Sequence, residues 1–102
     1  NKATAISGSG PAYFFAMLLS FIEAAHDLGF SREDATAMVI QTMRGASALI
    51  DEKTDFNLLI QRVASKGGTT EAALKIFEAH GNDQMWKNAI RASYERAKEL
   101  SK

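Results

Sequence analysis

The sequence predicts an all-α, bundle-like domain. Apolar residues recur at the three- and four-residue spacing of a helical face. The 7 Gly residues cluster between these periodic segments, and no stretch shows the alternation of a half-buried strand. At 102 residues the chain is long enough for one domain with a single core. We therefore expect about five helices joined by short turns and no sheet of consequence.

The first two expected helices follow from signals at their ends. Pro11 favours a helix start, because a proline in the first turn lacks an N–H group that would have no helical partner. This helix runs to about Leu28, after which Gly29 can take the left-handed conformation common at helix C-termini. Ser31 begins the next helix by capping free N–H groups. An apolar stripe carries that helix to Ile50.

Three further helices complete the predicted bundle. The polar residues 51–55 separate the second helix from a short third one over residues 56–63. A loop over residues 65–70 precedes the fourth helix, which ends near Gly81. The last helix begins around Asp83, with a near-heptad apolar stripe beside a solvated charged face.

Composition argues against several function classes. The 12 Lys and Arg balance the 12 Asp and Glu, so no basic field is available for a nucleic acid or an anionic membrane. There is no Cys, and His26 and His80 lie far apart, so neither disulfides nor a metal site is expected. The most apolar stretch, residues 11–22, is shorter than the roughly 20 residues of a membrane helix, and no signal peptide pattern is present. We expect a cytoplasmic protein without membrane or nucleic-acid partners.

The first expected helix is apolar around almost its whole circumference. Its large apolar residues are Tyr13, Phe14, Phe15, Met17, Leu18, Leu19, Phe21 and Ile22. A monomer of this size cannot easily cover them all, whereas a second copy can, and two-fold pairing is the commonest closed assembly. A homodimer is therefore expected. The alternative is a central helix wrapped within one chain.

The loop after the third helix is the candidate ligand site. Its residues are Ser65, Lys66, Gly67, Gly68, Thr69 and Thr70. The two glycines allow close backbone approach, and the two threonines stand at the start of a helix, where free N–H groups suit an anion. The Ser65 hydroxyl can add a hydrogen-bond donor for the anion, and the Lys66 ammonium group can add a positive charge. The loop thus predicts a carboxylate cradle, and the alternative is that Thr69 only caps the helix.

Two other patterns favour structural roles. Residues 8–13 share glycines with a dinucleotide-binding pattern, but no strand precedes them, so a turn and a helix start are expected. Glu23, His26 and Asp27 lie together on the first helix. For these three residues a solvated face or a satisfied core histidine is expected rather than acid/base chemistry.

Two segments resemble the signatures of the pyrroline-5-carboxylate reductase family. They are residues 6–13 (ISGSGPAY) and 63–70 (VASKGGTT). Residues 28–35 (LGFSREDA) and 41–46 (QTMRGA) resemble the family's second-helix region, so the resemblance covers essentially the whole chain. Lys66 and Ala64 depart from the family pattern, in which Pro and a hydroxyl residue are common at these positions. The departures bear on the rigidity and charge of the loop.

The resemblance implies an enzyme of proline biosynthesis. Residues 1–102 would be its C-terminal helical dimerisation and substrate-binding domain, and an N-terminal Rossmann domain for NADPH or NADH would be absent from this chain. Such an enzyme transfers hydride to the C=N carbon of 1-pyrroline-5-carboxylate and yields L-proline. No cofactor is expected on this chain itself, and the chain alone is expected to be inactive.

The resemblance also assigns roles to the loop. It implies that the substrate carboxylate is bound, near a homodimer interface, by Ser65, Gly67, Gly68, Thr69 and Thr70. Thr70 would act near the ring nitrogen as a hydrogen-bond donor or relay. Two alternatives stay open: a helical dimerisation module with no ligand site, and the helical domain of another reductase with a Rossmann partner. The homodimer could also belong to a higher oligomer.

Overall fold

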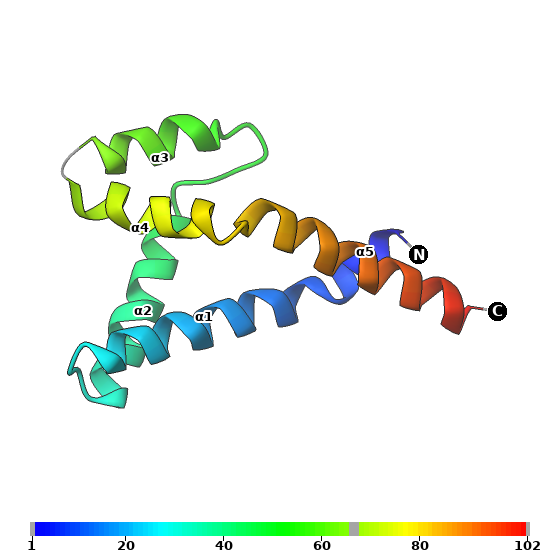
Figure 1. Ribbon diagram of the computed structural model, residues 1–102, viewed down its shortest axis with the longest axis horizontal. Coiled ribbons are helices and arrows are strands. Elements are labelled where there is room, and N and C mark those ends of the chain that lie inside the picture. Colours follow the sequence, from blue (N-terminus) through cyan, green and yellow to red (C-terminus); the bar gives the residue numbers. More distant parts are fainter. Residues whose placement is uncertain (1, 66–67, 102) are drawn as a thin grey trace. The chain divides into compact units, whose positions relative to one another are not determined.

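The structure, a computed structural model, describes residues 2–65 and 68–101, and every element in these ranges is helical (Figure 1). The elements are the π-helical turn η1 (Thr4–Gly8) and the helices α1 (Gly10–Asp27), α2 (Arg32–Ser47), α3 (Phe56–Ala64), α4 (Gly68–Ala79) and α5 (Asn82–Leu100). This confirms the predicted all-α class. The chain divides into two compact units. We call Ile6–Glu52 the hairpin unit, and Lys53–Lys102 together with Asn1–Ala5 the three-helix unit.

In the hairpin unit, α1 packs against α2, and both helices have the predicted end signals. Pro11 lies in the first turn of α1. Gly29 follows the end of α1 with a φ of 110°, a backbone conformation that favours glycine. The Ser31 hydroxyl accepts a hydrogen bond of 3.0 Å from the N–H of Asp34 and so caps α2.

Two boundaries in the hairpin unit differ from the prediction. α2 ends at Ser47, so Leu49 and Ile50 lie beyond it. Their N–H groups bond three residues back, to the carbonyls of Ala46 (3.1 Å) and Ser47 (3.3 Å), in a tight turn that stops the helix although the apolar spacing continues. The turn expected over residues 7–10 is partly helical, since η1 reaches Gly8.

The three-helix unit contains α3, which packs against α4, and α4, which packs against α5. The Asp55 carboxylate caps α3 by accepting the N–H of Leu58 at 3.1 Å. α4 begins at Gly68, earlier than expected, so the end of the predicted loop is the first turn of a helix. Gly81, with a φ of 70°, makes the turn into α5.

Little of the described chain is buried. The buried apolar side chains are those of Ala5, Ala35 and Val39, whereas Phe14 and Phe15 on α1 are 59% and 68% exposed. The apolar circumference predicted for this helix is therefore largely uncovered. The helical stretch Thr4–Asp27 has 24 residues and contains an 18-residue window with a mean hydropathy of 1.5, so it is also long and apolar enough to cross a membrane.

That length corrects the expectation that the apolar stretch is too short to span a bilayer. The prediction counted residues 11–22 alone, whereas the helical stretch extends beyond them at both ends. Core helices of soluble proteins reach the same length and hydropathy. Length and hydropathy therefore do not decide what covers this helix.

Candidate functional site

The predicted substrate loop lies where α3 ends and α4 begins. Ser65 is the C-cap of α3: its N–H donates to the Gln61 carbonyl at 2.8 Å, and its hydroxyl donates to the Arg62 carbonyl at 3.2 Å. In this orientation the hydroxyl proton is used inside α3, and the Ser65 oxygen can serve a ligand only as an acceptor. Lys66 and Gly67 lie outside the described residues.

Gly68, Thr69 and Thr70 form the start of α4. N–H groups in the first turn of a helix have no acceptor within the helix, and the helix dipole places partial positive charge there. A Cβ atom at Gly68 would meet nothing within 4 Å, so the backbone there is open to a ligand. Thr69 lies within the helix, whereas the N-cap precedes the first helical residue.

The charges around this helix start are mixed. Glu71 adds a carboxylate in the first turn of α4, and the Lys75 ammonium group pairs with it at 3.4 Å. A bound carboxylate would therefore depend on backbone N–H groups and hydroxyls more than on a basic cluster.

Thr70 is half-buried. Its hydroxyl is too weak an acid for ordinary general acid catalysis, but it can orient and polarise a bound group.

A separate groove of about 640 Å³ lies in the three-helix unit, near the other ends of α3 and α4. It is lined by Asn57, Ile60, Leu74, Phe77, Glu78, Gly81, Asn82, Asp83, Gln84 and Lys87. None of the predicted substrate residues is among them. Sequence reasoning missed this groove, because it forms only where three helices meet around the turn at Gly81.

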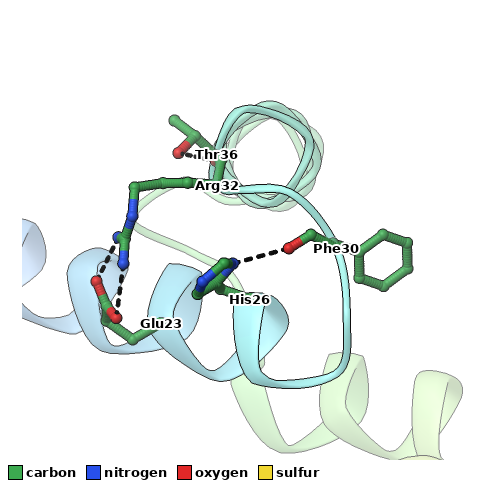
Figure 2. Close-up of polar contacts among 5 residues, drawn as sticks. All are labelled: Glu23, His26, Phe30, Arg32 and Thr36. Atoms are coloured by element: carbon green, nitrogen blue, oxygen red, sulfur yellow. Dashed lines mark hydrogen bonds and ion pairs between the residues drawn. The ribbon is translucent and has the colours of Figure 1, made fainter.

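The polar group on α1 has structural partners (Figure 2). Arg32 donates two hydrogen bonds to the Glu23 carboxylate, one of them 3.0 Å long. The Nδ1 atom of His26 lies 2.8 Å from the carbonyl oxygen of Phe30 and donates to it, since a carbonyl oxygen can only accept. The Arg32 hydrogen bonds hold the pKa of the Glu23 carboxyl below its ordinary value of 4.5. These contacts join the two ends of the α1–α2 turn, as fits the structural role expected for them.

The described residues offer no fit for a metal or a nicotinamide cofactor. In residues 2–65 and 68–101, no three His, Asp or Glu side chains are grouped so that they could hold a metal ion. Dinucleotides bind where a strand leads through a glycine turn into a helix, and all elements of the described chain are helices.

Together, these features define a helical domain that has an uncovered apolar helix and a helix start suited to an anion. The family model described as "Pyrroline-5-carboxylate reductase dimerisation" matches residues 1–100. The chain belongs to this family, as the two signature segments predicted.

Curated relatives and solved structures agree with the family match. A pyrroline-5-carboxylate reductase of Pseudomonas aeruginosa is 41% identical over 99% of this chain and 37% of its own length, and one of Haemophilus influenzae is 39% identical over 98% and 38%. The structure of the Coxiella burnetii reductase has a TM-score of 0.90 at 41% identity and covers 99% of this chain and 38% of its own. That of the Plasmodium falciparum enzyme, with NADP bound, has a TM-score of 0.91 at 32% identity, covering 99% and 39%. The chain thus spans well under half the length of these relatives.

Proposed function

We propose that this chain is the C-terminal dimerisation and substrate-binding domain of a cytoplasmic pyrroline-5-carboxylate reductase, which reduces 1-pyrroline-5-carboxylate to L-proline with NADPH or NADH. The observation that carries the proposal is the family match over residues 1–100. Relatives of that name are up to 41% identical over almost the whole chain, and one was solved with NADP bound. The nicotinamide would bind to a separate Rossmann domain outside these 102 residues.

The proposed partner is a second copy of the chain. α1 exposes Phe14, Phe15 and Phe21, and covering one such side chain fully is worth about 1.5 to 3 kcal/mol. A two-fold interface can cover the same helix in both copies at once. The family is described by its dimerisation, which favours a protein partner over lipid for this helix. Higher oligomers would be built from this dimer.

The proposed substrate contact is the start of α4. The N–H groups of Gly68, Thr69 and Thr70 would bind the carboxylate of 1-pyrroline-5-carboxylate, together with Gly67. Ser65 would join them by turning its hydroxyl proton from the Arg62 carbonyl to the carboxylate. The Thr70 hydroxyl would donate a hydrogen bond near the ring nitrogen. A nicotinamide bound to the other domain would provide the hydride that adds to the C=N carbon, while a proton from solvent goes to the ring nitrogen. The contribution of this chain would be to position the ring and polarise the nitrogen.

The test uses the enzyme that contains this domain and its nucleotide-binding domain. Thr70→Val removes the hydroxyl at nearly constant volume. Hydride addition to the neutral imine builds negative charge on the ring nitrogen that accepts this hydroxyl, and a hydrogen bond to a charged group is worth about 1.5 to 3 kcal/mol, so kcat/KM should fall about 10- to 100-fold. Thr70→Ser keeps the hydroxyl and should stay within a few-fold of wild type.

The alternative, a helical module without a ligand site, predicts a different pattern. If Thr70→Val leaves turnover intact but lowers the melting temperature, the threonine only stabilises the start of α4. The site assignment would then be wrong, while the family assignment would stand.

A further inference from the structure

The hairpin unit has almost no hydrophobic core of its own. Between α1 and α2 the buried apolar side chains are Ala35 and Val39, which are both small. Of the large apolar side chains, Leu18, Ile22 and Ile40 are half-buried, whereas Phe21 and Met38 are 51% and 40% exposed. Partly covered side chains fix the angle between two helices less firmly than a closely packed core does, because interdigitated side chains normally set that angle.

Polar contacts join the two helices instead (Figure 2). The Arg32 guanidinium, at the first residue of α2, reaches back to the Glu23 carboxylate near the end of α1 and binds both of its oxygens. A bidentate pair of this kind fixes direction as well as distance, because both groups are planar. The His26 ring ties α1 to the turn through the Phe30 carbonyl.

We propose that the Glu23–Arg32 pair, supported by the bond from His26 to Phe30, is a positioning clasp that sets the angle at which α1 and α2 present their apolar faces to a second copy. The inference rests on the proposed homodimer and names the residues that prepare the chain for it. Fixing the hairpin before association lowers the entropy lost on binding. The clasp therefore strengthens the dimer by fixing the angle between α1 and α2 in each copy before the two copies associate. The side chains of the clasp remain about half exposed, at 47% for Glu23 and 55% for Arg32.

The experiment measures the dimer dissociation constant of the 102-residue chain by sedimentation at low salt. Glu23→Gln and Arg32→Gln should each weaken the dimer about three- to fivefold, near the upper end for exposed ion pairs. The charge swap Glu23→Arg with Arg32→Glu should return the constant to within about twofold of wild type, because it restores an opposite-charge pair. Lys75→Gln is the matched control, because it breaks an exposed pair within α4 alone and should leave dimerisation unchanged.

A second measurement reports directly on the geometry of α1 relative to α2. Spin labels at the exposed residues Ser20 on α1 and Gln41 on α2 should give a broader distance distribution in Arg32→Gln than in wild type, at unchanged helicity by circular dichroism. If the single variants dimerise like wild type, or if the charge-swapped variant dimerises as weakly as the single variants, the proposed role of the Glu23–Arg32 pair is wrong. The proposed homodimer would be unaffected by either result. A wild-type chain that is monomeric throughout would overturn both.

Discussion

The hairpin unit and the three-helix unit use their charges differently. In the hairpin unit, the Glu23–Arg32 pair connects two helices. In the three-helix unit, four ion pairs each run along a single helix: Glu71–Lys75 on α4, and Arg91–Glu95, Glu95–Lys98 and Arg96–Glu99 on α5. Pairs along one helix stabilise that helix by a few tenths of a kcal/mol and keep its surface polar. A pair between helices can also set their geometry.

The contrast extends to the apolar surface and to the candidate site. The hairpin unit carries the uncovered apolar helix, which suits association. The three-helix unit carries the start of α4, which suits a small anion. In the proposed function, association and ligand binding would therefore use different parts of the chain, and variants in each part should affect different measurements.

The largest expected effect comes from placing a charge on the apolar face of α1. Phe15→Asp should weaken the dimer about 100-fold or more, because an unpaired carboxylate buried in an apolar interface costs several kcal/mol. Sedimentation would measure this. Lys75→Glu, on the charged surface of α4, is the control and should leave the mass unchanged. If Phe15→Asp dimerises like wild type, this face of α1 lies outside the interface.

A smaller effect is expected from replacing the glycine in the turn of each unit by alanine. Gly29 has a φ of 110°, outside the left-handed well near 60°, whereas Gly81 has a φ of 70°, close to that well. Gly81→Ala should cost about 1 to 2 kcal/mol in the free energy of unfolding, and Gly29→Ala should cost more, toward about 3 kcal/mol. Chemical denaturation would measure both. Equal losses would show that the two turns are equally tolerant.

The smallest effect is the pH dependence of the clasp. Because the pKa of Glu23 is lowered in the folded chain, its pair with Arg32 stabilises the fold above the ordinary carboxyl pKa of 4.5. This contribution is lost as the pH falls through the lowered pKa. The difference in the free energy of unfolding between wild type and Glu23→Gln should therefore be present at neutral pH and vanish at acidic pH. A difference that is constant with pH would mean that the pair does not form in solution.

Much of the fold could be predicted from local signals. Ser31 and Gly29 mark their helix ends in the sequence, because capping and left-handed glycine depend on a few neighbouring residues. The end of α2 could not be predicted, because the apolar spacing continues to Ile50 while the backbone has already turned. The groove around Phe77 and the Glu23–Arg32 pair were also missed, because both depend on how helices meet.

The predicted site is only partly described. Gly68, Thr69 and Thr70 lie together at the start of α4, and Ser65 ends α3. Their role in binding a carboxylate came from the family resemblance together with the chemistry of a helix start. Spacing alone could not separate a cradle from a cap, because both need a hydroxyl residue beside free N–H groups. The ligand test at Thr70 addresses that choice.

A second copy of the chain is proposed to cover the apolar face of α1. Sedimentation equilibrium of the chain, in buffer without detergent and across micromolar concentrations, measures this association. We expect a species of twice the 11.1 kDa chain mass. A single species of 11.1 kDa at every concentration, or a chain that stays in solution only with detergent, would contradict it.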